Sequence, residues 1–497
     1  IAGIQAAIDL KNQGFDVTIV EKKPFIGGMA ARIGKLPPEN MDLNEILEEY
    51  YKKIDELNIN VLTNAKVVNV SGFVGNFEVD ISQRERGVDI GECNFCGECS
   101  KVCPVDVKYG YSAWVPPRKV IYFKYNTYPE AYTIDFDACT NCGECVKACE
   151  QNAIQLDHRE NINIKLNVST IIIAVGATLY DPVGEYGYGE YPNVVTNMDV
   201  ERELSFRDVY ELTINNSKLK NVVYILCVGS RDPDNPKGTP GCSRYCCQNA
   251  IKQAIRLKER GVNVWIIFRD IRTFSKGTEE MYSEASKMGV QFINSYRKDK
   301  KPKVIDDGRK VEVFDELTGE TLLLDADAVV LSVGMVPNEI EVGELQKMLK
   351  IPRSGDGFFM EKHPKLGPVE TNTMGIYICG CAQSPKDIAD TIAQASASAA
   401  KAAIPMARGK IETEAITACV DDKLCVGCGT CEEVCEFGAP RLEENEIGVF
   451  ISRINQILCK GCGVCAVTCP SRAMSMRHFR DEQISKQIEA ALEEVAG

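Results

Sequence analysis

A spacing of cysteines that occurs four times constrains this chain more than any other feature. In each run, four cysteines are separated by two, two and three residues, and the runs begin at Cys93, Cys139, Cys425 and Cys459. Three closely spaced thiolates on one loop can hold three corners of a cubane, and the fourth thiolate reaches the other cluster of a pair. The sequence therefore predicts two ferredoxin-type modules with two [4Fe–4S] clusters each.

The crossover of the fourth cysteine predicts which thiolates share a cluster. The predicted ligand sets are Cys93, Cys96, Cys99 and Cys149; Cys139, Cys142, Cys145 and Cys103; Cys425, Cys428, Cys431 and Cys469; and Cys459, Cys462, Cys465 and Cys435. Each loop also contains a glycine where backbone N–H groups must approach the sulfurs closely, namely Gly97, Gly143, Gly429 and Gly463. The alternative is that one pair is degenerate and empty, but no ligand is missing from any run.

Cysteine usage and charge narrow the classes of protein. The 497 residues include 23 cysteines and three histidines, and the net charge is −14. Secreted disulfide scaffolds are short, and zinc sites use two-plus-two spacing or recruit histidine, so a reducing cytoplasm fits best. The negative charge argues against nucleic acid and anionic membranes as partners. No apolar run is long enough for a membrane span, and the alanine-rich stretch 391–403 predicts a packed helix.

The beginning of the sequence predicts a dinucleotide-binding fold. Residues 3–10 read as a helix that leaves a phosphate turn, and the β-branched strand 16–20 ends in Glu21. An acidic residue about 20 positions after a glycine turn binds ribose hydroxyls in such folds. Gly3 would be the last glycine of a GxGxxG motif, so we expect part of this domain to precede Ile1.

Later features support an FAD domain. Gly27 and Gly28 follow the acid, the stretch 170–177 resembles the strand that returns under FAD, and the stretch 375–382 resembles a strand that usually ends in Gly-Asp. Cys381 replaces that aspartate, which puts its hydrogen bond in doubt. The predicted FAD-binding residues are Gly3, Glu21, Lys22, Gly27, Gly28, Val68, Ala174, Gly176, Gly380, Cys381, Pro385, Lys386 and Ile388.

The stretch 385–388 is expected to begin the alanine-rich helix. The N-terminal dipole of that helix would point at the pyrimidine edge of the flavin. We expect Lys386 to tune the flavin. The alternative is a solvated lysine in the first helical turn.

A second nucleotide fold is predicted to have lost its nucleotide site. After the strand 221–226, the turn should read GxGxxG, but the stretch 227–231 has one glycine, so a nicotinamide site is not expected. A helix at 250–260 and strands at 263–268 and 328–334 complete ordinary α/β alternation. The turn carries an uneven cysteine set that suits a fifth, irregular iron–sulfur cluster, namely Cys227, Cys242, Cys246 and Cys247. A redox disulfide or inert core thiols are the alternatives, and Cys379, Cys381 and Cys419 are expected to bind no metal.

The combination resembles HdrA, the iron–sulfur flavoprotein of heterodisulfide reductase, and the resemblance covers nearly the whole chain. Besides the two ferredoxin-type modules, the residues that carry this resemblance are the turn that begins at Cys227 and the stretches 356–359, 363–366 and 385–388. It implies an α/β, thioredoxin-reductase-like flavoprotein with two dinucleotide-binding domains and with an inserted and a C-terminal 2[4Fe–4S] ferredoxin domain of α+β type. The expected domains are FAD-binding parts at 1–82, 165–217 and 337–411, the inserted ferredoxin at 83–164, the second Rossmann-like domain at 218–336 and the C-terminal ferredoxin at 412–497.

The resemblance also implies a function. The FAD is expected to take electron pairs from an iron–sulfur subunit of a hydrogenase or formate dehydrogenase in a cytoplasmic complex of methanogenic or other anaerobic cells. One electron would go to ferredoxin and the other to heterodisulfide reductase subunits B and C, which reduce the mixed disulfide of coenzyme M and coenzyme B. The disulfide chemistry is therefore expected on a partner, and the chain is expected to be a homodimer within the complex. The stretch 36–43 lacks the cysteines that the family often carries there, so a cluster at that place is not expected.

Three alternatives stay open at this point. The first is an NAD(P)H-dependent iron–sulfur flavoprotein oxidoreductase like the small subunit of glutamate synthase, against which the missing glycine turn counts. The second is a non-catalytic electron-transfer scaffold with an empty flavin site. The third is a polyferredoxin fused to a structural α/β domain, which Glu21, Gly27 and Gly28 together weaken.

Overall fold

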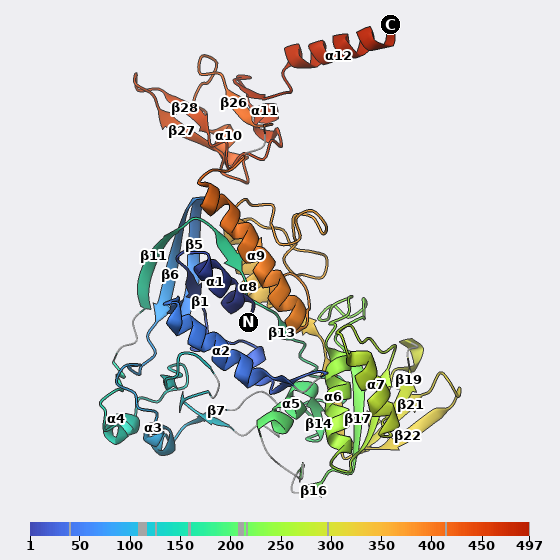
Figure 1. Ribbon diagram of the computed structural model, residues 1–497. Helices are drawn as coiled ribbons and strands as arrows, with labels where there is room; N and C mark the ends of the chain where they lie inside the picture. The colour runs from blue at the N-terminus through green and yellow to red at the C-terminus, as the bar shows by residue number, and fades with distance from the viewer. Residues whose placement is uncertain are drawn as a thin grey trace. The chain divides into compact units, whose positions relative to one another are not determined.

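The computed structural model divides the chain into two compact units (Figure 1). It describes residues 1–38, 41–107, 117–124, 127–157, 161–206, 213–214, 217–295, 298–412 and 415–496. The first unit comprises Ile1–Val70, Glu78–Asn167 and Ile171–Ala403. The second unit comprises Ser71–Phe77, Val168–Thr170 and Ile404–Gly497.

Among its described residues, the first lobe of unit 1 contains two short pairs of parallel strands and four α-helices, two of which pack against each other near the N-terminus. Strand β1 pairs with β4, and β12 pairs with β25, each in parallel. Apolar residues at helical spacing bury one face of α1 against α2. The elements are α1 (Ala2–Asn12), β1 (Thr18–Val20), η1 (Ala30–Arg32), β2 (Lys35–Leu36), β3 (Met41–Asp42), α2 (Leu43–Glu56), β4 (Asn60–Leu62), β12 (Ile171–Ile173), β13 (Thr178–Leu179), β24 (Met335–Val336), α8 (Glu339–Leu349), β25 (Ile376–Ile378), η3 (Gly380–Ala382) and α9 (Ile388–Arg408).

A three-stranded sheet and a cysteine-rich insert interrupt this lobe in the chain, between β4 and β12. The sheet has the order β11-β6-β5, from β5 (Ala65–Phe73), β6 (Asn76–Arg84) and β11 (Asn161–Val168). Between β6 and β11, two five-residue helices contact each other, and two small antiparallel strand pairs flank them. The insert's elements are α3 (Glu98–Val102), β7 (Asp106–Val107), β8 (Arg118–Lys119), β9 (Ile121–Tyr122), β10 (Thr133–Ile134) and α4 (Glu144–Ala148).

The second lobe of unit 1 holds a five-stranded parallel sheet of order β14-β23-β17-β18-β19. The chain therefore moves outward from β17 through β18 to β19 and then returns to the other side of β17 with β23, which is the winding of a nucleotide-binding half. The elements are β14 (Val194–Thr196), α5 (Asn197–Phe206), β15 (Thr213–Ile214), β16 (Ser217–Lys218), β17 (Asn221–Val228), α6 (Cys246–Lys258), β18 (Asn263–Phe268), α7 (Thr278–Lys287), β19 (Gln291–Asn294), η2 (Lys298–Lys300), β20 (Lys303–Ile305), β21 (Lys310–Phe314), β22 (Thr321–Asp325) and β23 (Ala328–Val333).

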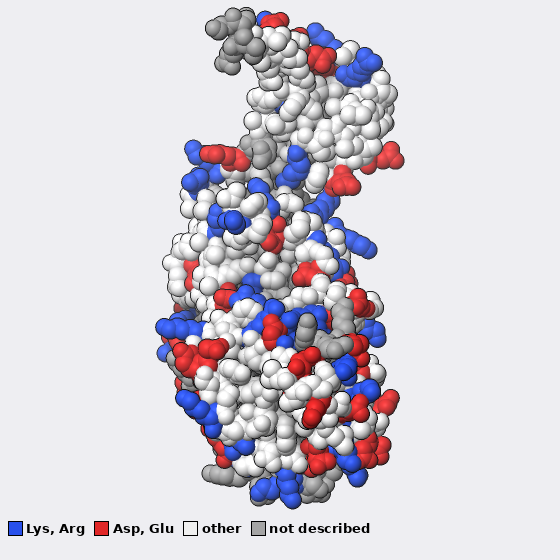
Figure 2. Space-filling view, turned by 90° about the vertical axis from the view of Figure 1, so that its right-hand side faces the viewer, with Lys and Arg blue, Asp and Glu red and all other residues white. Residues whose placement is uncertain are grey.

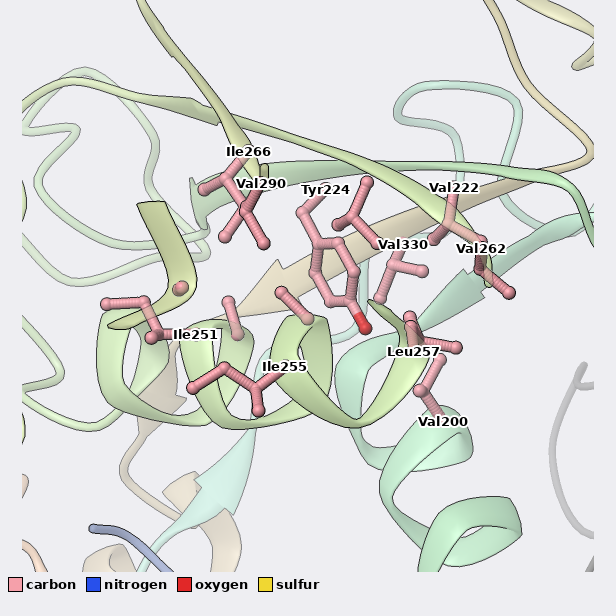
Figure 3. Packing of buried hydrophobic residues seen from close by; sticks show 14 of the residues in the cluster. Val200, Val222, Tyr224, Ile251, Ile255, Leu257, Val262, Ile266, Val290 and Val330 are labelled. Atoms are coloured by element: carbon pink, nitrogen blue, oxygen red, sulfur yellow. The ribbon is translucent and has the colours of Figure 1, made fainter. Parts of the chain in front are cut away.

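Alternation along β17 explains how this sheet is covered on both faces. Val222 and Tyr224 point to a core that they share with helices α5, α6 and α7, and Figure 3 shows the Tyr224 ring between the strands and α6. Val223 and Ile225 point to the other core, which the hairpins β20-β21-β22 cover. Because successive side chains of a strand face opposite sides, a strand that is apolar throughout must be buried on both.

The structure agrees with the expected elements and corrects two boundaries. The strand expected at 263–268 is β18, and the alanine-rich stretch 391–403 lies within α9. The helix expected at 250–260 begins earlier, at Cys246. The helix expected from 385 begins only at Ile388, because the Asp387 carboxylate accepts a hydrogen bond from the Asp390 N–H and ends the preceding loop.

Unit 2 contains a second cysteine-rich fold with two short helices and two strand pairs. Strand β26 pairs with β29, and β27 pairs with β28, both antiparallel. The elements are β26 (Ala418–Val420), α10 (Thr430–Glu433), β27 (Pro440–Glu444), β28 (Phe450–Ile454), α11 (Val464–Thr468), β29 (Met474–Met476) and α12 (Asp481–Ala496).

Surface charge is mixed on the face that Figure 2 shows, where basic and acidic side chains are interspersed. Many surface charges of the chain are paired locally, as in the ion pairs of Lys22 with Glu341 and of Lys66 with Glu344. Such exposed pairs contribute about 1 kcal/mol or less each. Within the residues that the structure describes, no helix is both long and apolar enough to cross a membrane.

Candidate functional site

The four cysteine loops share one backbone geometry. In each loop a glycine with φ between 78° and 80° precedes a short helix, and these glycines are Gly97, Gly143, Gly429 and Gly463. The residue before the second cysteine of each loop also has positive φ, namely Phe95, Asn141, Gly427 and Gly461. Left-handed backbone turns the N–H groups of a short loop toward one centre, so the loops can wrap an anionic group.

The crossover of cysteines is visible in the inserted module. A shallow cavity is lined by Cys93, Cys96 and Cys99 of the first loop and by Cys149 of the second. Cys145 lies near enough to interact electrostatically with Cys139, Cys142 and Cys103. Burial raises the pKa of the Cys99 thiol to about 12, and its cysteine neighbours add to this shift. The buried Cys99 thiol would therefore lose its proton only to a strongly positive centre.

The C-terminal module repeats this arrangement. A cavity is lined by Cys425, Cys428 and Cys431 together with Cys469. Cys465 in turn is near Cys459, Cys462 and Cys435, and burial raises its pKa to about 11. The structure thus brings together all four sets of cysteines that the spacing predicts.

Hydroxyl groups lie close to three cysteines of the set formed by Cys425, Cys428, Cys431 and Cys469. Ser452 Oγ lies 3.2 Å from Cys431 Sγ, Thr430 Oγ1 lies 3.4 Å from Cys428 Sγ, and Ser471 Oγ lies 3.6 Å from Cys469 Sγ. The Ser452 N–H also donates to Cys425 Sγ at 3.5 Å. Cysteine spacing did not predict these contacts: Ser452 lies on β28 and 21 residues from Cys431, and Thr430 and Ser471 lie near cysteines in sequence but carry no signal of their own. Hydrogen bonds to thiolate sulfur favour the reduced form of a cluster.

The fifth cysteine set lies at the carboxyl end of the parallel sheet in the second lobe. Cys227 is near the end of β17, where the register with β23 shifts, and its φ is +62°. Cys246 and Cys247 form the first turn of α6, and Cys242 precedes them. Carboxyl ends of strands and N-termini of helices are where such sheets bind ligands, and the helix dipole favours negative charge there.

Arginines surround this set. Arg231 Nη1 lies 4.0 Å from Cys227 Sγ and forms an ion pair with Asp270, which also binds Arg272. Burial raises the pKa of the Cys227 thiol, while Arg231 and Arg269 oppose that rise. The site would therefore stabilise a group with net negative charge. A thiolate-bound cluster carries such a charge.

The Cys227 set is predicted to hold a cluster, with a redox disulfide or inert core thiols as alternatives. All 23 cysteines are free, including the adjacent pair Cys246 and Cys247. In the described part of the chain, no three side chains of His, Cys, Asp or Glu are arranged to hold a single metal ion. A cubane separates its four thiolates more widely than one ion does, so the cluster remains a prediction.

The predicted FAD-binding glycines lie where helix and strand approach each other. A Cβ atom at Gly3 would be 3.4 Å from Ala174 Cβ, so α1 packs closely on the segment after β12. Gly380 has φ +64°, and its Cβ would be 2.9 Å from Ala2 Cβ. Close packing of this kind is the role of the last glycine in a dinucleotide turn. Gly27, Gly28 and Gly176 also have positive φ.

Glu21 lies directly after β1, and its Oε1 accepts a hydrogen bond from the Lys23 N–H at 2.8 Å. Burial raises the pKa of Glu21. Lys22 instead points to solvent and pairs with Glu341 at 3.0 Å, and Val68 is 49% exposed on β5. The position of Glu21 at the end of β1 is consistent with the predicted ribose contact, which stays a prediction, whereas Lys22 and Val68 are exposed.

Lys386 lies in the loop before α9, not in its first turn. Its Nζ donates to Gln383 Oε1, and to Ser384 Oγ at 2.7 Å and Ser384 O at 3.2 Å. The side chain is 9% exposed, so the alternative of a solvated lysine is wrong. Burial lowers its pKa, and Arg244 adds to that shift while Cys381 and Asp390 oppose it. Pro385 and Ile388 flank this loop.

The cysteine loop of the second lobe meets the predicted flavin turn. Arg244 Nη2 lies 2.6 Å from Asp390 Oδ2 in the first turn of α9. Cys381 Sγ lies 3.9 Å from Met335 Sδ, and the Met335 N–H donates to Ser243 Oγ at 2.8 Å. Ser243 and Arg244, which lie between cysteines of the fifth set, are thus brought to the segments that carry Cys381 and Lys386.

Two family models match cysteine-rich parts of the chain. A family model of a 4Fe-4S dicluster domain matches residues 424–474, and a model of a 4Fe-4S binding domain matches residues 132–155. The fold is similar to the solved thioredoxin reductase of T. acidophilum, with a TM-score of 0.45, 16% identity and coverage of 83% of this chain and 96% of that one.

Two curated relatives match nearly the whole chain. One is the first of the iron-sulfur HdrA proteins of the CoB–CoM heterodisulfide reductase in Methanopyrus kandleri, 44% identical over 99% of this chain and 76% of its own length. The other is the HdrA protein of the H2/formate:CoB–CoM heterodisulfide, ferredoxin reductase in Methanococcus maripaludis, 42% identical with the same coverage. Identity of this degree over this length shows that the chain belongs to the HdrA family of CoB–CoM heterodisulfide reductase iron–sulfur proteins, whose members are oxidoreductase subunits.

Proposed function

We propose that this chain is an electron-transfer subunit of a heterodisulfide reductase complex and that it holds FAD beside an iron–sulfur cluster. The observation that carries the proposal is the contact between the Cys242–Cys247 loop and the beginning of α9. Arg244 of that loop pairs with Asp390, and Lys386 lies within interacting distance of both. A one-electron carrier on the cysteine set would therefore adjoin the flavin turn.

The residues fit a bound FAD. Glu21 presents a carboxylate after β1, and the absence of a side chain at Gly3 and Gly380 allows α1 to pack closely on the segment after β12 and on η3, as in a dinucleotide turn. Lys386 holds a buried positive charge before α9, and that helix directs its N-terminal dipole toward the same place. The flavin supplies the chemistry of accepting two electrons together and releasing them singly, whereas each cluster accepts one.

The cysteines fit five clusters. The four ferredoxin sets would hold one [4Fe–4S] cluster each, and the Cys227 set would hold a fifth of irregular geometry. Each set gathers four sulfurs from two stretches of chain, and Arg231, Arg269 and Arg272 offset negative charge at the fifth set. These modules would conduct electrons and leave disulfide chemistry to a partner.

We further propose that electron pairs arrive from an iron–sulfur subunit of a hydrogenase or formate dehydrogenase and divide at the flavin. One exit would lead to ferredoxin and the other to subunits B and C. Supporting this, the M. maripaludis relative is named for H2, formate, the CoB–CoM heterodisulfide and ferredoxin together. A relative in Methanothermobacter marburgensis, 40% identical, is named for H2, the heterodisulfide and ferredoxin.

Anaerobic reconstitution with candidate partners tests this proposal. We expect purified chain to contain close to one FAD and iron in place of zinc. With partners, ferredoxin reduction by a weak donor should require the heterodisulfide. Ferredoxin reduction that runs equally well without the disulfide would contradict division of electron pairs, and protein without flavin would contradict the proposed cofactor.

One observation bears on the alternative that uses NAD(P)H. The turn after β17 has a single glycine, and a Cβ atom at Gly229 would overlap the Tyr180 ring. The backbone of this turn is therefore covered by an aromatic side chain where a pyrophosphate would need access. We expect neither NADH nor NADPH to reduce the flavin, which anaerobic stopped-flow absorbance would show.

A further inference from the structure

Part of the inserted iron–sulfur module lies against the predicted nucleotide turn. The ring centroid of Phe25, which follows Glu21 and Lys23 in the turn, is 6.1 Å from that of Tyr122 and 6.4 Å from that of Phe123. The Ile26 N–H donates to the Tyr128 carbonyl at 2.9 Å. The segment 120–124, here called the insert strap, is therefore packed against the turn that carries Glu21.

The insert strap ends in Lys124, which faces a group of other cations. Lys23 follows β1, Arg32 ends η1, and Arg202 lies on α5. All three lie close enough to Lys124 to lower its pKa, whereas Glu21 opposes them. We call this set the basic cluster, and its members are Lys23, Arg32, Lys124 and Arg202.

The Lys124 ammonium is unbalanced in this environment. It has no hydrogen-bond or ion-pair partner among the residues that the structure describes. Burial, followed by repulsion from Arg32, Lys23 and Arg202, lowers its pKa to about 7. A half-buried cation held among other cations costs free energy unless an anion joins it.

We infer that the basic cluster binds the phosphate groups of the flavin dinucleotide, so that Lys124 makes the inserted iron–sulfur module part of the cofactor site. This inference rests on the proposed function, because it takes the dinucleotide to be FAD. Phosphate oxygens accept charge-assisted hydrogen bonds from lysine and arginine, and these bonds are stronger than neutral ones. The insert strap would then couple flavin occupancy to the position of the module that carries Cys93 and Cys139.

Titration of the flavin-free full chain with FAD and with riboflavin tests the role of Lys124. Riboflavin carries the isoalloxazine ring and no phosphate. We expect Lys124→Met to weaken FAD binding by about ten- to a hundredfold, the equivalent of one lost charge-assisted hydrogen bond, and to leave riboflavin binding unchanged. Lys124→Arg should retain most of the FAD affinity. Dissociation constants would come from quenching of flavin fluorescence under anaerobic conditions.

Lys119→Met is the matched control. Lys119 lies just before the insert strap, but its Nζ pairs with Asp106 at 3.1 Å, so its loss should not change FAD affinity. Iron content and circular dichroism of each variant would show that the module still folds.

The pH dependence of affinity gives a second readout. A bound phosphate would keep Lys124 protonated, so binding must take up a proton at pH values above about 7, where the free protein has lost it. FAD affinity should then be flat below that pH and fall by up to about tenfold per pH unit above it. Because this slope comes from the proton on Lys124, Lys124→Met should abolish it.

Three outcomes separate the possibilities. Loss of FAD affinity with retained riboflavin affinity supports the inference. Equal FAD affinity of wild type and Lys124→Met overturns it and leaves the proposed flavin in place. Failure of the wild-type chain to bind FAD at all overturns the proposed cofactor and, with it, this inference.

Discussion

Arg244 and Asp390 form an ion pair with 2.6 Å between Nη2 and Oδ2, and this pair joins the cysteine loop of the second lobe to the first turn of α9. The Arg244 guanidinium also lies 4.9 Å from the centroid of Phe274. Cation–π contact and ion pairing together fix the guanidinium between the loop and the helix. The two predicted cofactors are therefore connected by one side chain.

Replacing Arg244 by methionine removes a positive charge beside the Cys227 set. Negative charge on a reduced cluster is then stabilised less, so we expect its midpoint potential to fall on the order of tens of millivolts. Both partners are about one-third or more exposed, so stability should change by about 1 kcal/mol or less. Redox titration followed by electron paramagnetic resonance measures the potential. Lys303→Met, which breaks an exposed pair with Glu312, is the control, and equal shifts in both variants would contradict a local effect.

Ser452→Ala tests whether hydroxyl groups tune the C-terminal module. The Cys431 thiol donates to Ser452 Oγ at 3.2 Å. As a cluster ligand Cys431 would be a thiolate, which can only accept, so the Ser452 hydroxyl would then donate and favour the reduced cluster. A differential hydrogen-bond free energy of roughly 1 kcal/mol corresponds to a fall of roughly 40 mV for one electron. Thr468→Val is the matched control, because the Thr468 hydroxyl bonds the Val464 carbonyl instead of sulfur. An unchanged potential in Ser452→Ala would exclude this role.

The local geometry of the cysteine loops could be predicted from sequence, whereas their surroundings could not. Spacing alone indicated which cysteines meet, and the glycines before the short helices were expected because backbone must turn toward the sulfurs. Phe95 and Asn141 take the same positive φ as Gly427 and Gly461, although neither residue type signals it. In the case of Phe95, packing against Phe123 accompanies that conformation.

Long-range partners account for most of what the sequence did not reveal. Burial of Lys386 follows from hydrogen bonds to Gln383 and Ser384, and no periodicity marks a loop lysine as buried. The approach of Lys124 to Glu21 joins residues that are distant in the sequence. Such contacts depend on the placement of the whole insert, which local propensity and spacing do not encode.

A buried ion pair between Glu201 on α5 and Lys252 on α6 supports the second lobe. Their side chains are 0% and 3% exposed, and Nζ lies 2.6 Å from Oε1. Gln253 and Asn249 also donate to Glu201, at 2.8 and 3.0 Å. Lys252→Met leaves this carboxylate buried without its cation, so we expect a loss of about 3–5 kcal/mol in the free energy of unfolding. The double variant with Glu201→Gln should recover part of it.

The same pair makes stability depend on pH. Burial alone would raise the pKa of Glu201, but Lys252 and the amide donors hold it below its usual range. A carboxyl whose folded pKa is depressed contributes stability above its unfolded value of about 4.3 and loses it as pH falls through the folded value. Denaturant unfolding of wild type should therefore show a loss of stability in acid that Glu201→Gln reduces. An identical acid dependence in both proteins would contradict this linkage.

Gly380→Ala tests the close packing of α1 on the predicted flavin turn. Gly380 has φ +64°, and an added Cβ would lie 2.9 Å from Ala2 Cβ and 3.2 Å from Thr391 Cγ2, so backbone strain and crowding act together. Gly14 has φ +88° with no atom within 4 Å of an added Cβ, so Gly14→Ala isolates the cost of the backbone, about 1 kcal/mol. We expect Gly380→Ala to lose more stability than this control and also to retain less flavin on purification. Thermal unfolding and the flavin-to-protein absorbance ratio measure the two effects, and full flavin retention would show that the turn tolerates displacement of α1.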